Sequence, residues 1–154
     1  MLDRIQRERL TQALERIGVQ QTPDQPDVQD EVEAIESFLG ATLPADCRWF
    51  LLNHGEVYIG SMMLPGEGGR AYPVRSFYGA KLTDGRRLST VTDIFSDDLD
   101  PAEMPIGNDV MGDQMTLYAP TGKIGYLWID EGSRSLDIAA SFTDLVEQLV
   151  PYDE

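Results

Sequence analysis

The chain has 154 residues, 42% of them apolar and 25% charged, and 27 acidic against 12 basic side chains give it a formal net charge of −15. This length and apolar content predict one folded domain, residues 1–154, with a core of its own. The excess of carboxylates argues against binding to nucleic acid or to an anionic membrane, because both require clusters of Lys and Arg. The partner that such a charge attracts is a basic one.

The sequence shows no sign of export or of membrane insertion. Its first residues, MLDRIQRERL, are charged from Asp3 onward, unlike a secretory signal, and no apolar run is long enough to span a bilayer. Cys47 is the single cysteine, which rules out an internal disulfide and fits a reducing compartment. We therefore expect a cytoplasmic protein.

The first helix is predicted within residues 1–22. Apolar side chains recur there at the spacing of one helix face, and Gly18 stands where a helix C-terminus favours glycine. The inward positions are Leu2, Ile5, Leu10, Ala13, Leu14 and Ile17. Residues 23–29 follow as a polar connector, because Pro23 and Pro26 cannot sit inside a helix.

Two more helices are expected in the first third of the chain. One runs from about Asp27 to Leu39, and its core face consists of Val32, Ile35, Phe38 and Leu39. The next begins at Pro44, whose missing N–H costs nothing in a first helical turn. It brings Trp49 and Phe50 into the core and ends near Gly55.

Strand patterns replace helix patterns after residue 56. The predicted strands are VYIG (57–60), AYPVRSFY (71–78), GDQMTLY (112–118) and KIGYLWID (123–130). The glycine-rich GEGGR (66–70) predicts a turn between the first two, and APTG (119–122) a hairpin turn between the last two. In the last strand Ile124, Tyr126 and Trp128 share one face, and Leu127 and Ile129 share the other. Because both faces are apolar, we expect this hairpin to be covered on both sides.

The remaining elements complete the fold class. STVTDIF (89–95) fits either a strand or a short helix capped by Ser89 or Thr90. A final helix is predicted after Ser141, with a core face of Phe142, Leu145, Val146 and Leu149 and with Pro151 as its stop. Helices, then strands, then a helix predict an α+β fold: a single domain with a largely antiparallel sheet flanked by helices.

No catalytic or metal-binding motif stands out, and we expect no cofactor and no metal. Asp109 and Asp113 lack the alternating oxygen ligands and the final glutamate of an EF-hand loop, so they are interpreted as turn residues. Cys47 and His54 lie about 10 Å apart along the predicted helix, too far for a catalytic dyad. His54 is instead predicted to end that helix, where a positive charge is favourable.

Four segments, taken in order, resemble the SUKH superfamily of Smi/Knr-like domains. They are IESFLGATLPADCRWFLLNHG (35–55), MPIGNDVMGDQMTLY (104–118), TGKIGYLWID (121–130) and IAASFTDLVEQL (138–149). The resemblance implies an α+β fold without enzymatic activity. It also implies one of two roles: a bacterial immunity protein that neutralises a toxin domain, often a nuclease, or a cytoplasmic regulator linked to cell-wall synthesis and signalling, as in fungi.

Three hypotheses remain open from the sequence. The first is an immunity-type module whose acidic surface masks a basic, nuclease-type toxin domain. The second is a regulatory scaffold that binds endogenous cytoplasmic partners. The third is an enzyme that uses paired carboxylates, since 27 acidic residues always offer pairs, although no pair is singled out.

The partner-binding surface is predicted in the stretch 95–113, which holds six acidic residues and no basic one. The predicted contact residues are Asp97, Asp98, Asp100, Glu103, Asp109 and Asp113, with Phe77 and Tyr78 as aromatic anchors nearby. The alternative surface is the other acidic block, between Asp24 and Glu36.

Overall fold

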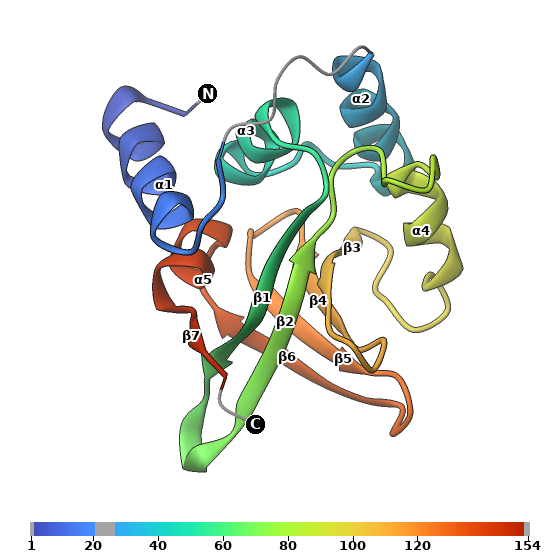
Figure 1. Cartoon of the computed structure of the whole chain (residues 1–154). Coiled ribbons are helices and arrows are strands. Elements are labelled where there is room, and N and C mark those ends of the chain that lie inside the picture. The colour runs from blue at the N-terminus through green and yellow to red at the C-terminus, as the bar shows by residue number, and fades with distance from the viewer. Residues whose placement is uncertain (1, 21–26, 153–154) are drawn as a thin grey trace.

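The computed structural model describes residues 2–20 and 27–152, which form five α-helices and one seven-stranded sheet (Figure 1). The helices are α1 (Arg4–Arg16), α2 (Val28–Leu39), α3 (Ala45–Asn53), α4 (Leu88–Ile94) and α5 (Phe142–Gln148). The strands are β1 (Val57–Pro65), β2 (Ala71–Phe77), β3 (Glu103–Asn108), β4 (Gln114–Tyr118), β5 (Ile124–Trp128), β6 (Ser133–Ala139) and β7 (Val150–Pro151). The predicted α+β class is confirmed.

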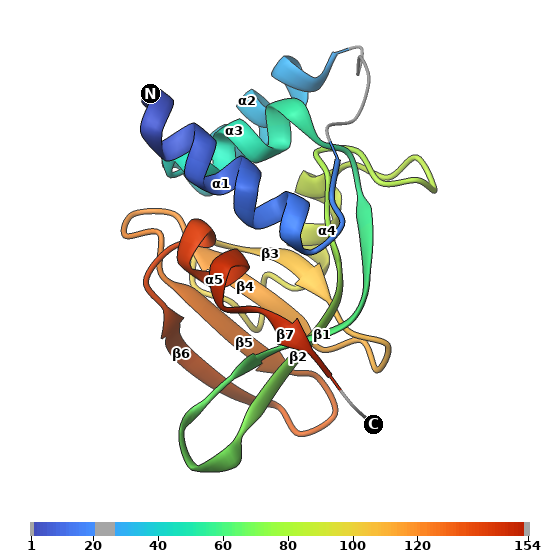
Figure 2. The same cartoon turned by 60° about the vertical axis from the view of Figure 1, so that its left-hand side comes forward.

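The sheet is antiparallel at every pairing and has the order β6-β5-β4-β3-β2-β1-β7. It curls, so that the β1–β2 hairpin stands opposite β5 and β6 (Figure 2). Helices α1, α2 and α3 lie together at one end of the sheet, and the β1–β2 and β5–β6 hairpins extend from the other end (Figures 1 and 2). No helix among residues 2–20 and 27–152 has the length and apolar character needed to cross a membrane.

Local sequence signals fix the two ends of α1. Asp3 and Gln6 form a capping box: the Asp3 carboxylate accepts from the Gln6 N–H at 2.8 Å, and the Gln6 side chain accepts from the Asp3 N–H at 3.2 Å. The helix ends at Arg16, before Gly18 turns the chain with φ +86°, so it is shorter than the segment 1–22 assigned from the sequence. Ile5 was expected in the core, but it lies in the first turn of α1 and is exposed.

The second helix begins and ends close to its predicted limits. Gly40 adopts the left-handed conformation (φ +67°) that closes a helix, as expected for a glycine at this place. Phe38 was expected to face the core but is 45% exposed. The predicted connector 23–29 lies mostly outside the described residues, and Pro23 and Pro26 are among those outside.

The core lies between the helices and the inner face of the curled sheet. Phe50 of α3, Phe77 of β2 and Phe142 of α5 meet there, with ring centroids 5.0–6.0 Å apart. Gly107 of β3 passes beneath Phe77, and a Cβ at this glycine would lie 2.6 Å from the Ser76 carbonyl oxygen. Glycine is therefore required where β3 meets β2.

The outer face of the sheet is partly covered by α4 and by residues 95–102, which lead from α4 to β3. Arg134 of β6 donates to the carbonyl oxygen of Asp98 at 3.2 Å, which holds this segment against the sheet. The stretch STVTDIF (89–95), which fitted either a strand or a helix, lies almost wholly in the helix α4. The N-cap of this helix is Arg87 and not Ser89 or Thr90.

Three strands were not predicted. The stretch containing Pro105 and Gly107, which received no strand assignment from the sequence, is β3, and the mixed polar and apolar residues Ser133–Ala139 form the edge strand β6. The predicted last helix is confirmed as α5, in which the Ser141 hydroxyl accepts from the Asp144 N–H at 3.1 Å. After it the chain adds the short strand β7 to the sheet, paired with β1.

Candidate functional site

The two side chains best suited to nucleophilic chemistry are both buried. Burial raises the pKa of the Cys47 thiol, which keeps it protonated. His54 caps the C-terminus of α3, as predicted, and its Nδ1 lies 3.2 Å from the Gln20 carbonyl oxygen. Burial lowers the pKa of His54, so the expected positive charge at this helix end is not favoured. Among the described residues no three His, Cys, Asp or Glu side chains gather as a metal site.

The two predicted aromatic anchors are in the interior. Phe77 has no exposed surface and packs on Phe50 and Phe142, and Tyr78 is 6% exposed. The Tyr78 hydroxyl donates to the Gln114 side chain at 2.8 Å. The placement of these two rings on a partner surface is therefore corrected: strand β2 turns Phe77 toward the helices, and Tyr78 is buried next to β3 and β4, with its N–H bonded to the Ile106 carbonyl oxygen.

Glu103 is buried in a polar network. Its carboxylate forms an ion pair with Arg134 and accepts from the Asp100 N–H at 3.1 Å. A buried carboxylate needs such compensation, because the loss of its hydration would otherwise destabilise the fold. Glu103 therefore anchors residues 95–102 on the sheet and offers little charge to a partner at the surface.

Asp97, Asp98 and Asp100 are exposed, as the prediction requires. None of them forms an ion pair within the described part of the chain. Their position is fixed all the same, because Leu99 between them is buried and Arg134 binds the Asp98 carbonyl oxygen. These three carboxylates stand on a segment that is fixed in place.

Asp109 and Asp113 lie in the β3–β4 turn, separated from Glu103 by the length of β3, about 16 Å at the usual rise of a strand. The Asp113 carboxylate accepts from the Ile129 N–H at 3.0 Å, so this turn lies beside the β5–β6 turn. The structure thus divides the predicted site between two ends of β3.

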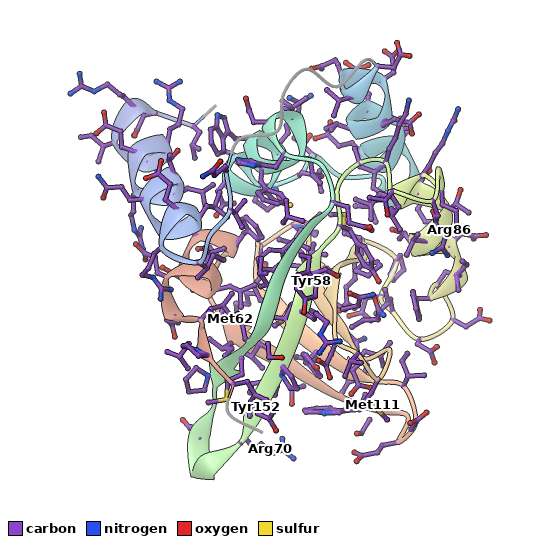
Figure 3. The ribbon with its side chains drawn as sticks, in the orientation of Figure 1. Tyr58, Met62, Arg70, Arg86, Met111 and Tyr152 are labelled. Carbon is purple, nitrogen blue, oxygen red and sulfur yellow. The ribbon has the colours of Figure 1, made fainter. Side chains whose placement is uncertain are left out.

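Apolar side chains are exposed at the surface of these two turns. Val110 is 58% exposed and Met111 66% exposed, and Ile129 is partly exposed beside them. Figure 3 shows Met111 at the end of the molecule far from Arg86 and α4. We call this surface the acid-rimmed tip, and it consists of Asp109, Val110, Met111, Asp113, Ile129, Asp130 and Glu131.

The acid-rimmed tip and the Asp97–Asp100 segment are linked by Arg134. This residue follows the β5–β6 turn by a few positions in β6 and binds the carbonyl oxygen of Asp98. The four carboxylates of the tip, like those of the segment, form no ion pair among residues 2–20 and 27–152. Unpaired carboxylates are therefore present both on the segment and at the tip, with Arg134 between them.

The sequence contained a signal for the apolar part of the tip. Val110 and Met111 stand in a predicted turn, between Asp109 and Gly112, where polar residues are the rule. Two adjacent exposed apolar residues in a turn are therefore a candidate contact surface. They were not considered as partner contacts in the sequence interpretation.

Two carboxylates of the alternative acidic block pair with the protein's own cations, while Asp27, Asp30 and Glu33 are exposed and form no ion pair among the described residues. Glu31 is buried and pairs with Arg87 at 3.2 Å, and Glu36 pairs with Arg48 at 3.3 Å. The Glu36 carboxylate also accepts from the Leu43 N–H at 2.9 Å. These two carboxylates stabilise the packing of α2 against its neighbours, while Asp24 lies outside the described residues.

Trp128 is partly buried at the open end of the curled sheet. It packs against Tyr72 and Tyr126, and the Arg70 guanidinium lies 5.5 Å from the centre of its ring. A groove of about 750 Å³ runs from Arg70 and Tyr72 to Leu136 of β6. Trp128 thus contributes to the core, as expected, and also supports the rim of this groove.

The chain was compared with curated proteins and with models of protein families. A search of curated proteins found no match. Residues 28–148, from the start of α2 to the end of α5, match the SMI1 / KNR4 family (SUKH-1), and this range contains every element of the sheet except β7. The chain therefore belongs to the SMI1 / KNR4 family (SUKH-1).

Proposed function

We propose that this protein is a cytoplasmic immunity protein that binds and neutralises a basic toxin domain of the nuclease type. It acts by binding and not by catalysis. Membership of the SMI1 / KNR4 family supports the general role of a protein-binding module. That the partner is a basic toxin domain is proposed in addition, from the charge and the exposed apolar residues of the surface described above.

The observation that carries the proposal is the gathering of unpaired carboxylates around exposed apolar side chains. Seven of the 12 basic residues form ion pairs with carboxylates elsewhere in the described structure, yet none of these pairs includes Asp97, Asp98 or a carboxylate of the acid-rimmed tip. Uncompensated like charges repel one another in the free protein. A basic partner would remove that repulsion, and Met111 would give the contact an apolar centre.

A nuclease-type toxin domain has the matching chemistry. Its active surface must present Lys and Arg to the phosphates of nucleic acid. An acidic protein that occupies this surface competes directly with the nucleic acid. The net charge of −15 also attracts such a domain from a distance and raises the association rate.

The experiment takes its partner from the genes beside the gene of this chain, where the proposal expects a basic toxin domain. The chain and the toxin domain are produced together, and cell growth and the dissociation constant of the complex are measured. Replacing Asp97, Asp98 and Asp100 together by Asn should leave the fold intact and weaken binding at least tenfold, which corresponds to about 1.4 kcal/mol.

A matched control changes the net charge by the same amount elsewhere. Glu8→Gln, Glu15→Gln and Glu67→Gln alter three exposed carboxylates on α1 and between β1 and β2, outside both acidic blocks. This control should keep almost full affinity if the contact is local. Equal weakening in both triple variants would show that only net charge matters, and binding to endogenous cytoplasmic proteins without toxin protection would favour the regulatory scaffold instead.

A further inference from the structure

Residues 95–102 connect α4 to β3 without forming a helix or a strand, and they carry the three exposed carboxylates of the Asp97–Asp100 segment. The apolar anchor of this segment is Leu99, which is buried but lies apart from the main core cluster. A connection with so little apolar burial is expected at the low end of local stability. The polar contacts that hold it on the sheet therefore determine how its carboxylates are presented.

Two side chains from different strands meet beneath this segment. Glu103, at the start of β3, extends across β4, and its Oε2 lies 3.7 Å from the position that a Cβ of Gly125 in β5 would take. Arg134 approaches from β6 on the other side, and its Nη2 forms the ion pair with the same oxygen. The pair therefore connects β3 to β6 across the two strands between them.

The ion pair is bonded to the segment at two points. The Asp100 N–H donates to the second oxygen of the Glu103 carboxylate at 3.1 Å, and Nη1 of Arg134 donates to the Asp98 carbonyl oxygen at 3.2 Å. Within residues 2–20 and 27–152, the bond from Arg134 is the one that joins residues 97–100 to a strand other than β3. A guanidinium can bind two acceptors at once because its nitrogens form a rigid planar fork.

Stability alone is a weak reason for this ion pair. The Glu103 side chain is only 3% exposed, and the buried Nε of Arg134 has no hydrogen-bond partner among the described residues. Apolar residues of similar volume often stabilise a fold at least as well as a buried ion pair does. The bond to the Asp98 carbonyl oxygen, in contrast, requires a donor at this place.

We propose that Arg134 is a positioning residue, which orders the Asp97–Asp100 segment in the free protein and so prepares its three carboxylates for the basic partner. The inference rests on the proposed function, which makes these carboxylates the contact. A mobile segment loses conformational freedom when it binds, and this loss weakens the complex. Because Arg134 already imposes the order, binding does not have to supply it.

The test replaces Glu103 and Arg134 together by Met, which removes both bonds to the segment and leaves no unpaired buried charge. One acidic and one basic residue are lost, so the net charge stays at −15. In the free chain, the ¹⁵N order parameters of residues 97–100 should fall from about 0.85 to below about 0.6. The affinity for the basic toxin domain should fall about tenfold, while stability in urea stays nearly unchanged. A change in net charge cannot cause this loss.

Asp84→Asn with Arg86→Gln is the matched control, because it also removes one ion pair at constant net charge, on the loop before α4. It should keep the order parameters and the affinity of the natural chain. Arg134→Lys is the second variant, since it keeps a positive charge beside Glu103 but lacks the planar fork. Its order parameters and its affinity should lie between those of the natural chain and of the double Met variant.

Order parameters that do not change in the double Met variant would overturn the inference, and so would a mobile segment with unchanged affinity. If the double Met variant does not fold, Arg134→Lys decides, and natural order and affinity in that variant would overturn the inference. The relaxation measurement needs no toxin, so it is separate from the test of the proposed function. A segment that is ordered by Arg134 in a chain that binds no basic toxin domain would overturn the proposed function and the partner assigned here.

Discussion

Thr143 donates two hydrogen bonds to a single carboxylate oxygen of Asp46, from its backbone N–H at 2.9 Å and from its hydroxyl at 2.8 Å. The other carboxylate oxygen accepts from the Cys47 N–H at 2.8 Å. These bonds join the first turn of α3 to the first turn of α5, across 97 positions of the chain. Both residues are buried, so the carboxylate replaces its lost hydration with protein donors.

Asp46→Asn should therefore lower the free energy of unfolding by about 2–3 kcal/mol, because an amide offers one acceptor oxygen where the carboxylate offers two. Thr143→Val removes one of the three donors and should cost about 1 kcal/mol. Urea unfolding of both single variants and of the double variant measures the coupling. A double variant whose loss equals the sum of the two single losses would show that the residues act independently.

Phe50→Ala should cost about 3–5 kcal/mol of unfolding free energy, since the ring is buried against His54, Phe77 and Phe142. Phe38→Ala is the matched control, because the same atoms are removed from a side chain that is 45% exposed. It should cost less than about 1 kcal/mol. A Phe50→Ala variant with normal stability in urea but weakened partner binding would place this ring on the interface instead.

The elements found from the sequence are those with a strong local signal. Ser141 caps its helix, and Gly18 and Gly40 close theirs, as the pattern predicted, whereas the capping box at Asp3 was not predicted. The β4–β5 hairpin is equally well marked, because apolar residues on both faces of β5 are required of a covered strand.

The strands that were missed owe their conformation to their neighbours. Strand β3 contains Pro105 and Gly107, which suggest a loop by propensity, and it is ordered by its pairing with β4 and by Phe77 above it. Strand β6 is an edge with polar residues, and Asp137 at φ +64° interrupts its alternation. Both strands depend on pairing with neighbouring strands, which a local sequence pattern does not show.

The candidate site was predictable in its charge but not in its geometry. The acidic stretch 95–113 was found, and Asp97 and Asp98 are exposed as expected. Composition does not reveal that Arg134, more than thirty positions away, would bury Glu103, or that β2 would turn Phe77 inward. Long-range pairing decides which members of a charged run face the solvent.

The stability of the protein should depend on pH through His54. Burial lowers its pKa below the value of about 6.5 of an exposed imidazole, with the contact to the Gln20 carbonyl oxygen opposing this effect. Below pH 6.5 the unfolded chain therefore binds more protons than the folded chain. The contribution of His54 is complete above pH 6.5 and is lost as the pH falls from there through the lowered pKa of the folded state.

Urea unfolding at pH 7.5 and at pH 5.5 measures this effect. The unfolding free energy of the natural chain should decrease at pH 5.5, by at most about 1.4 kcal/mol per pH unit from this one group. His54→Gln does not titrate, so its loss between the two values should be smaller, while the carboxylates contribute equally to both proteins. An identical loss in the two proteins would exclude His54 as the cause.

The final prediction separates the two parts of the proposed surface by kinetics. The carboxylates Asp97, Asp98 and Asp100 act through a long-range field, so their replacement by Asn should chiefly lower the association rate of the basic partner. Met111 acts only in contact, because apolar burial has no long-range field. Met111→Ser should therefore leave association nearly unchanged and raise the dissociation rate, by about tenfold if the side chain is a central anchor.

Both rates are measured by stopped flow at low and at high salt, since salt screens exposed charges beyond about 10 Å at 0.1 M. Association of the natural chain should slow several-fold as the salt concentration rises, and the triple Asn variant should show a weaker salt dependence. Ile5→Ser is a matched control for Met111→Ser, because Ile5 is 73% exposed and lies on α1, outside the acid-rimmed tip. If Ile5→Ser raises the dissociation rate and Met111→Ser does not, the apolar anchor lies at α1 rather than at the tip. A salt-independent association rate would remove electrostatic attraction from the mechanism.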